Sequence, residues 1–290
     1  VTVMRDGRKV GSEAIEDVTP QSLVQMMVGQ TIDEFYHQRT PKLGDTVLAV
    51  EHLTRQGFVH DISFDLRAGE ILGVAGLAGA GRSELARSMC GLDPMHDGRV
   101  MLGGEPLPQG DYPGSVKRGL VYLSEDRKND GLFLRLPVSR NLLSALTARH
   151  SRGGIYRPGH DRSIVAEQMK QLQIAAASPE AEVNTLSGGN QQKVLLGKWL
   201  AQSPRVLVLD EPSRGVDVGA KRLIHEAVMA LADQGTAVLL LSSDLPELVG
   251  LSDRALILRN GHLVGALSKD EMTEEAVLLA ANGAMGRGSE

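Results

Sequence analysis

The sequence predicts an α/β fold with a parallel sheet and an inserted helical segment. Three short apolar runs, at residues 70–75, 205–209 and 236–241, have the composition of buried parallel strands. A glycine-rich loop follows the first run, and segments with helical patterns separate the runs from one another. Strands that alternate with helices are typical of α/β sheets, so these observations together predict the fold class.

The other segments from residue 46 onward complete this pattern. Residues 46–53 and 62–66 alternate between apolar and polar side chains, which predicts strands. Residues 126–180 change character and read as mostly helical. One apolar face of this helical segment consists of Val165, Met169 and Leu172. The remaining predictions are a helix at 83–90, closed by Gly91, and a strand at 120–123.

Length and composition are those of an ordinary globular chain. The 290 residues have room for one large α/β domain or two small ones. Hydrophobic residues make up 42% and charged residues 23%, which excludes a disordered chain. The net charge of −5 and the aromatic content of 3% disfavour a nucleic-acid-binding surface, so we expect no nucleic-acid partner. A single cysteine, Cys90, excludes a disulfide framework and a multi-cysteine metal site.

The sequence shows neither a membrane-spanning segment nor an export signal. The longest apolar runs, such as residues 237–241, are far too short to cross a bilayer. No segment reads as a signal peptide. We therefore expect a soluble, intracellular protein.

Residues 1–29 match residues 255–283 without a gap. Both segments read as a strand, a tight turn, a second strand and a helix that begins after threonine and ends at glycine. The identical pairs are Arg5/Arg259, Gly7/Gly261, Val10/Val264, Gly11/Gly265, Thr19/Thr273 and Gly29/Gly283. We interpret residues 1–45 as the tail of a preceding module plus a linker, with its joint at residues 38–45. The alternative is chance similarity between two common strand–turn–strand–helix units.

The first motif with chemical meaning is the phosphate loop, residues 76–83, with the sequence GLAGAGRS. Glycines let backbone N–H groups surround phosphate oxygens, and the following helix N-terminus favours an anion. Ser83 is placed to bind Mg²⁺ through its hydroxyl, while Arg82 stands where this motif usually has lysine. The nucleotide contacts predicted here are Gly76, Gly79, Ala80, Gly81, Arg82, Ser83 and Glu84. The alternative is a glycine-rich turn without a ligand.

Two further motifs follow in a fixed order. The apolar run at 205–209 delivers Asp210 and Glu211 to a strand end, where Asp210 would bind Mg²⁺ and Glu211 would polarise the attacking water. Before it, residues 186–192 place Ser187 as a helix N-cap ahead of two glycines that allow close approach to an anion. Taken alone, the acidic pair has solvated side chains as its alternative, and residues 186–192 have an ordinary capped helix start. The interpretation therefore rests on the order in which the three motifs occur along the chain.

This ordered set resembles the nucleotide-binding domain of ATP-binding cassette (ABC) proteins over about residues 46–283, with residues 284–290 as a tail. The resemblance implies a P-loop NTPase cassette with a RecA-like parallel-sheet core, an N-terminal antiparallel β subdomain and a helical subdomain at about 126–180. It implies ATP as substrate and Mg²⁺ as cofactor. It adds to the nucleotide contacts the signature residues Ser187, Gly188, Gly189 and Gln191, and Asp217 of the D-loop.

Residues 124–131 and 213–220 make the chain similar to the second cassette of the monosaccharide importers of ribose, galactose and xylose type. That resemblance implies an ATP hydrolase at the cytoplasmic face of the bacterial inner membrane, held there as a peripheral protein by membrane permease subunits. An extracytoplasmic sugar-binding protein would be an indirect partner. The direct partner would be a first cassette of the same chain or a second ATPase copy.

Three positions depart from an active cassette. Arg82 replaces the loop lysine, Glu125 stands at the Q-loop position that contacts Mg²⁺, and Ser243 stands where the switch histidine is expected. Phe58 is the nearest candidate for stacking on adenine, but we expect it in the core. Since cassettes pair head to tail, this half would supply its signature to a partner's ATP and hydrolyse its own slowly. The alternatives are a nucleotide-binding half without hydrolysis and a soluble ABC protein of translation or DNA repair.

Overall fold

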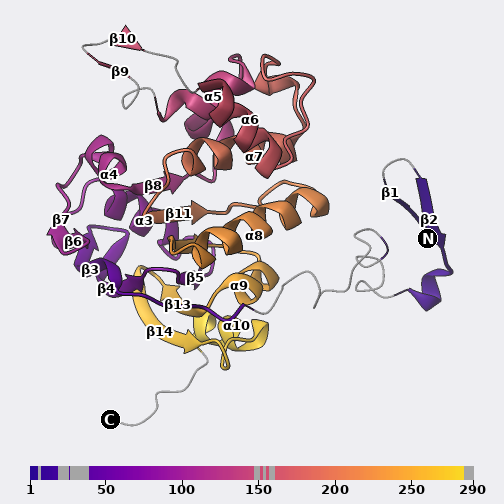
Figure 1. Ribbon diagram of the computed structural model, residues 1–290. Helices are drawn as coiled ribbons and strands as arrows, with labels where there is room; N and C mark the ends of the chain where they lie inside the picture. The colour runs from indigo at the N-terminus through magenta and orange to yellow at the C-terminus, as the bar shows by residue number, and fades with distance from the viewer. Residues whose placement is uncertain are drawn as a thin grey trace.

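The computed structural model describes residues 1–5, 8–18, 26, 39–146, 151–152, 155–156 and 161–283. Most of the strands between residues 46 and 283 run through the middle of the fold and helices pack around them, which confirms the predicted α/β fold (Figure 1). In the described part of the chain, none of the helices combines the length and the apolar character needed to cross a membrane.

The central sheet has six strands in the order β14-β13-β5-β12-β11-β8. β13 and β14 are antiparallel, and all other neighbours are parallel. The three predicted apolar runs therefore become the adjacent strands β5, β12 and β11. The strands are β5 (Ile71–Gly76), β8 (Leu120–Leu123), β11 (Val206–Asp210), β12 (Ala237–Leu241), β13 (Arg254–Arg259) and β14 (His262–Ser268).

A second, antiparallel sheet has the order β4-β3-β6-β7. It consists of β3 (Thr46–Arg55), β4 (Val59–Arg67), β6 (Asp97–Leu102) and β7 (Glu105–Pro106). β3 and β4 confirm the two strands that alternation predicts. Phe58 lies just before β4 and is 46% exposed, so the prediction that it belongs to the core is wrong. The tight turn between β3 and β4 keeps its ring at the surface.

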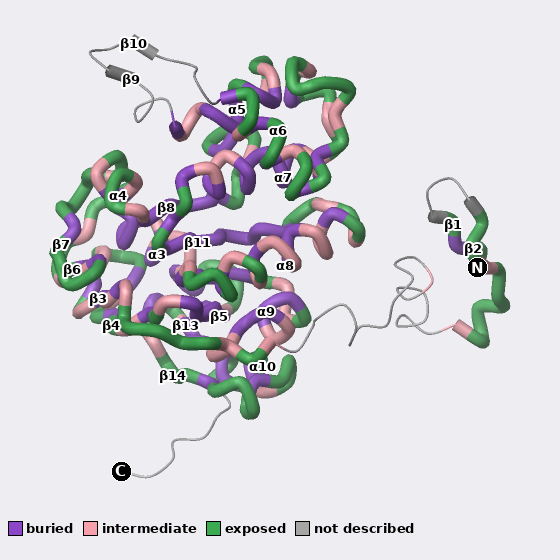
Figure 2. Tube along the Cα trace, in the orientation of Figure 1, coloured by how far each residue is buried: buried purple, intermediate pink, exposed green. Residues whose placement is uncertain are grey.

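The core explains why the central strands read as continuous apolar runs. Every residue of β11 and β12 is buried, because both faces of this part of the sheet are covered. Val208 packs toward the antiparallel sheet and Leu209 toward the helices on the opposite face. Figure 2 shows this buried band crossing the molecule. Alternating side chains thus join two cores without leaving a polar face.

The helices are α3 (Arg82–Cys90), α4 (Tyr112–Arg118), α5 (Val138–Ser144), α6 (Asp161–Gln171), α7 (Gly188–Leu200), α8 (Val218–Asp233), α9 (Leu245–Leu251) and α10 (Glu274–Asn282). The predicted helical segment contains the π turn η2 (Arg127–Gly131), α5, α6 and the short antiparallel pair β9 (Ser151–Arg152) and β10 (Ile155–Tyr156). Val165 and Leu172 are buried and Met169 packs on the same core, which confirms the predicted apolar face.

The two segments that match in sequence form hairpins with the same register. β1 (Thr2–Arg5) pairs with β2 (Arg8–Ser12), and the 3-10 turn η1 (Ile15–Asp17) follows. Adding 254 to both residue numbers of each β1–β2 pair gives a β13–β14 pair. The pair Thr2↔Ser12, for example, corresponds to Leu256↔Ala266. The register irregularity also falls at the same place, after Val3 and after Ile257. The Asp6–Gly7 turn and residues 284–290 lie outside the described residues, as does the helix expected after Thr19 apart from residue 26. Of the expected joint at residues 38–45, the structure describes 39–45.

Asn141 of α5 is fully buried and holds the start of the helical segment together. Its amide oxygen accepts from the Phe133 N–H over 2.8 Å. Its amide nitrogen donates to the carbonyls of Phe133, Leu136 and Pro137 over 3.0 to 3.3 Å. One side chain therefore satisfies backbone groups that have no regular secondary structure.

We expect Asn141→Ala to lower the free energy of unfolding by about 2 kcal/mol, because buried backbone groups lose their partner. Urea denaturation followed by circular dichroism measures this loss. Asn129→Ala is the control, since Asn129 is exposed and bonds Asp126 over 2.7 Å; it is expected to change stability by less than about 0.5 kcal/mol. Equal losses in the two variants would contradict the bridging role of Asn141.

Candidate functional site

The phosphate loop joins the end of β5 at Gly76 to the start of α3 at Arg82. Gly81 has a φ of 99°, and a Cβ there would lie 2.8 Å from Val59 Cγ1, so only glycine fits. Gly81 is also the N-cap of α3, and no side chain caps the first N–H groups of this helix. Those donors suit an anion, which supports a phosphate at this loop. Gly79 also has a positive φ, of 78°, and Ala80 is buried beneath the loop.

Arg82 extends from the loop to the ends of two neighbouring strands. Its Nη1 donates to the Ser242 carbonyl over 2.6 Å, and its Nη2 lies 3.1 Å from Glu211 Oε1. The Arg82 side chain is 12% exposed and that of Glu211 8%, so this ion pair is largely removed from water. Arg82, the predicted phosphate contact, and Glu211, the predicted base, therefore form an ion pair.

Glu211 follows β11 in an uncommon left-handed conformation, with a φ of 50°. Its second oxygen, Oε2, accepts a hydrogen bond from Ser243 Oγ over 3.0 Å. Ser243, predicted at the switch position, thus lies next to Glu211. Both oxygens of the carboxylate are engaged, one by a cation and one by a hydroxyl.

Asp210 lies one residue earlier, at the end of β11. Burial raises its pKa, and hydrogen bonds from Tyr122 and Ser83 offset part of that rise. The Tyr122 hydroxyl donates to Asp210 Oδ2 over 2.7 Å, and burial also raises the pKa of this tyrosine. Glu84, in the first turn of α3, adds a repulsive charge. Tyr122 is a residue that sequence analysis did not identify, because only the parallel pairing of β8 with β11 brings it there.

The oxygen donors near the loop fit Mg²⁺ bound together with phosphates. Ser83 and Asp210 provide a hydroxyl and a carboxylate in hydrogen-bond contact. Mg²⁺ commonly takes one or two protein carboxylates and completes its octahedron with phosphate and water oxygens. The third predicted ligand, Glu125, forms an ion pair with Arg214. In the described part of the chain no three His, Cys, Asp or Glu side chains form a metal-binding group.

A second group of predicted residues gathers at the start of α7. Ser187 is the N-cap, and its hydroxyl accepts from the Asn190 N–H over 3.4 Å, which confirms the predicted cap. Gly188 leaves room for Arg127, since a Cβ there would lie 2.9 Å from Arg127 Nη2. Arg127 donates to the carbonyls of Arg214 and Gly215 over 2.9 and 3.3 Å. The π turn η2 therefore ties the signature helix to the segment that follows Glu211.

The remaining predicted residues of this group support the same junction. Asp217 is the N-cap of α8 and accepts from the Ala220 N–H over 2.9 Å. Gly189 faces Ala220 and Asp217 across the junction. Gln191 is buried, and its amide donates to the carbonyls of Val183 and Leu186 over 3.2 Å each. Its side chain thus supports the signature loop from within the protein.

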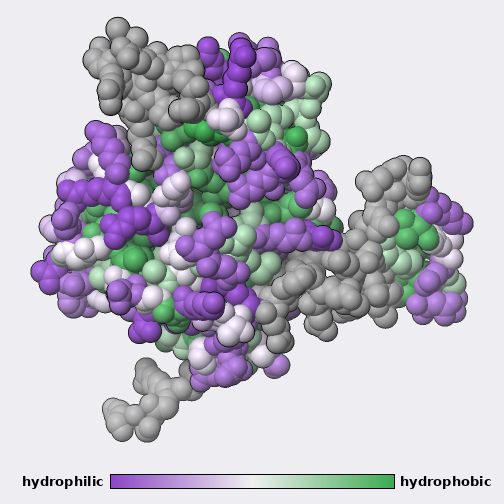
Figure 3. Space-filling model, in the orientation of Figure 1, coloured by the Kyte–Doolittle hydropathy of each residue, from purple (hydrophilic) through white to green (hydrophobic). Residues whose placement is uncertain are grey.

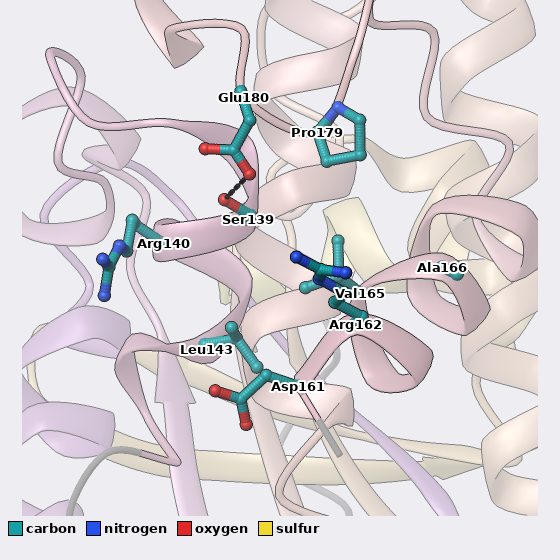
Figure 4. Close-up of a pocket in the computed structure, with 9 residues that line it drawn as sticks. All are labelled: Ser139, Arg140, Leu143, Asp161, Arg162, Val165, Ala166, Pro179 and Glu180. Carbon is teal, nitrogen blue, oxygen red and sulfur yellow. Dashed lines mark hydrogen bonds between the residues drawn. The ribbon is translucent and has the colours of Figure 1, made fainter. Parts of the chain in front are cut away.

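Several hollows lie away from the phosphate loop, among them the following two. Figure 4 shows one of about 530 Å³ between α5, α6 and residues 179–180, with Leu143 and Val165 in its wall and Ser139 bonded to Glu180 at its edge. The other, about 240 Å³, lies between α3, α4 and α7 and is lined by Tyr112, Tyr122 and Trp199 among others. The view in Figure 3 shows hydrophobic side chains at the surface below the helical segment.

The family model and the similar sequences point to the same family. Residues 59–214 match the family described as ABC transporter. The "Ribose import ATP-binding protein RbsA" of Oceanobacillus iheyensis is 42% identical over 99% of this chain and 58% of its own length. The "Ribose import ATP-binding protein RbsA 2" of Agrobacterium fabrum is 46% identical over 97% of this chain and 56% of its own. The chain therefore spans little more than half the length of these relatives.

Solved structures agree on the fold. A nucleotide-free ATP-binding cassette from an ABC transporter aligns with a TM-score of 0.69 at 19% identity, over 85% of this chain and all of its own. A dimeric cassette in a post-hydrolysis state, bound to ADP and Pi, aligns with a TM-score of 0.66 at 19% identity, over 77% of this chain and 98% of its own. At this identity the likeness shows the fold alone.

The contact between Arg82 and Glu211 predicts a measurable coupling. We expect Arg82→Met and Glu211→Gln each to lower the free energy of unfolding by about 2 kcal/mol, because each leaves a partner buried alone. The double variant is expected to lose about 1 kcal/mol less than the sum of the two. Urea denaturation of all four proteins measures this cycle.

The exposed pair Arg222–Glu226 on α8, at 2.7 Å, supplies the matched control cycle. Its coupling is expected to stay below about 0.5 kcal/mol, because water screens it. A coupling at Arg82–Glu211 no larger than this control would contradict a buried ion pair.

Proposed function

Because the chain belongs to the ABC transporter family, we propose that it is an ATP-binding part of a monosaccharide importer. The observation that carries this proposal is the common location of the phosphate loop, Asp210 and Glu211 at the carboxyl ends of β5 and β11. Ligands of open α/β sheets bind at such strand ends. The names of the relatives refer to ribose import, which favours a role in sugar import over a soluble role in translation or DNA repair.

Different residues are proposed to bind different parts of ATP. We propose that the N–H groups of the loop and of α3 hold the phosphates, while Ser83 and Asp210 hold Mg²⁺, which neutralises phosphate charge when bound. Phe58 is half-exposed, its carbonyl lies beside Gly81, and the Arg55 guanidinium lies 4.4 Å from its ring centroid. This position supports stacking of adenine on the exposed part of the Phe58 ring.

Hydrolysis at this site is proposed to be slow. A general base needs a free oxygen directed at the attacking water. Here Arg82 occupies one oxygen of Glu211 and Ser243 the other. The same contacts favour the second candidate, a nucleotide-binding half that performs no hydrolysis of its own.

The signature group is proposed to serve the ATP of another cassette. Ser187 caps the start of α7, and Gly188 lies close to Arg127, which donates to the carbonyls of Arg214 and Gly215. The matching hairpins β1–β2 and β13–β14 support the view that residues 1–45 are the end of a first cassette plus a linker. The length of the relatives is consistent with two cassettes in one chain.

Membrane partners follow from the same proposal. We propose that permease subunits dock on the helical segment and on the hollow lined by Tyr112, Tyr122 and Trp199. Tyr122 also bonds Asp210, so this hollow lies directly behind the proposed Mg²⁺ site. The protein would then be held at the cytoplasmic face of the bacterial inner membrane, with an extracytoplasmic sugar-binding protein as an indirect partner.

A comparison of binding with turnover tests this proposal on the 290-residue chain. We expect a fluorescent ATP analogue to bind in the presence of Mg²⁺, while phosphate release stays near the background set by Asp210→Asn. The double variant Arg82→Lys, Ser243→His is expected to raise the rate at least about tenfold, because Glu211 is released from its guanidinium. Rapid turnover by the native chain would contradict a slow site, and absence of nucleotide binding would contradict the proposal as a whole.

The division of labour between cassettes needs a protein that carries both. We expect Ser187→Ala to lower its ATPase rate at least about tenfold, and Arg82→Ala by no more than about threefold, because only Ser187 would face the competent site. Thr185→Ala, just before the signature segment, is the control, since the Thr185 hydroxyl donates to the Glu182 carbonyl over 2.6 Å. Comparable losses from Ser187→Ala and Arg82→Ala would exclude this arrangement.

A further inference from the structure

A buried carboxylate lies behind the proposed nucleotide site. Glu247 of α9 is 1% exposed, and its Oε1 lies 2.7 Å from Nε2 of the fully buried His225 of α8. Ser242 Oγ donates to the other oxygen, Oε2, over 2.5 Å. Ser213 also hydrogen-bonds this carboxylate. Three partners from three separate segments therefore meet at one side chain.

Two of these partners, Ser213 and Ser242, belong to the two segments that flank Glu211. Ser213 lies two residues after Glu211, at the start of the D-loop segment, residues 213–217. Ser242 and Ser243 begin the switch segment, residues 242–244. The Ser242 carbonyl accepts from Arg82, and Ser243 donates to Glu211. Glu247 thus connects the D-loop segment to the residues that contact the Arg82–Glu211 pair.

Several contacts fix the same loop from its other side. The Asp244 N–H donates to Ser242 Oγ over 3.1 Å, and Asp244 accepts from the Glu247 N–H over 2.9 Å as the N-cap of α9. Lys221 of α8 donates to Asp244 over 2.6 Å. The switch segment is therefore held at both ends. Of the side chains named here that hold it, only Glu247 also bonds the D-loop segment.

Stability alone is a poor reason for this arrangement. Burial raises the pKa of Glu247, but the contacts with His225, Ser242 and Ser213 lower it by more, so the pKa lies below its ordinary value. Taking a carboxylate and an imidazole out of water is costly, and apolar residues of similar volume are often equally stabilising. What such a buried network provides is one defined geometry for the loops it joins.

We propose that Glu247 is a positioning residue that sets the switch segment against Glu211 and couples it to the D-loop segment. This inference rests on the proposed function, because it assigns to the loop a part in sensing the terminal phosphate of a nucleoside triphosphate. ADP lacks that phosphate but shares the groups that the phosphate loop would hold. The ratio of ATP affinity to ADP affinity therefore reports on the switch segment separately from the loop.

The experiment measures the affinities of MgATP and MgADP for the 290-residue chain by isothermal titration calorimetry. We expect the native chain to prefer ATP. Glu247→Gln is expected to bring the affinity ratio at least about fivefold closer to one, with ADP affinity unchanged within about twofold. Ser242→Ala removes one hydroxyl from the same network and is expected to act in the same direction. It keeps the inference testable if Glu247→Gln does not fold.

Glu226→Gln is the matched control, because Glu226 follows His225 on α8 but its side chain is 42% exposed. Its affinity ratio is expected to equal that of the native chain. Equal losses of ATP and ADP affinity in Glu247→Gln would show a merely structural role and overturn the inference, as would an unchanged ratio or a native chain without preference. Binding of neither nucleotide by the native chain would instead contradict the proposed function.

Discussion

Parallel pairing of β5, β12 and β11 is the constraint on which the rest of the structure depends. Leu241 pairs with Val74 on one side and with Asp210 on the other, so three strands end at the same edge. The phosphate loop, the acidic pair and the switch segment each begin where one of these strands ends. A shift of one residue in this register would exchange the buried faces and separate the charged groups.

Charged groups at this edge are held in pairs and short networks, because the surrounding sheet and helices exclude water. Glu211 pairs with Arg82, Asp210 bonds Tyr122, and Glu247 bonds His225. Each network links a residue of one strand end to another element, so the networks also fix the loops relative to one another. Low dielectric makes such contacts strong when complete and costly when broken.

The two hairpins illustrate how a local pattern depends on its surroundings. β13 and β1 have the same pairing with their partners, yet Leu258 of β13 is fully buried while its counterpart Met4 is 62% exposed. β13 also pairs with β5, which places it inside the central sheet. An exposed apolar side chain at a position that the matching hairpin buries is consistent with the proposed origin of residues 1–45 in another cassette.

Sequence by itself determined the α/β class, the central strands, the glycine-rich loop and the capped start of α7, because apolar periodicity and turn chemistry are local properties. Tertiary structure alone decided which side chains meet. The partners of Arg82 and the contact of Tyr122 with Asp210 depend on segments far apart in the chain. Phe58, which we expected in the core, is exposed by the turn between β3 and β4. Burial can be predicted from spacing, but long-range pairing of polar groups follows only from strand order and register.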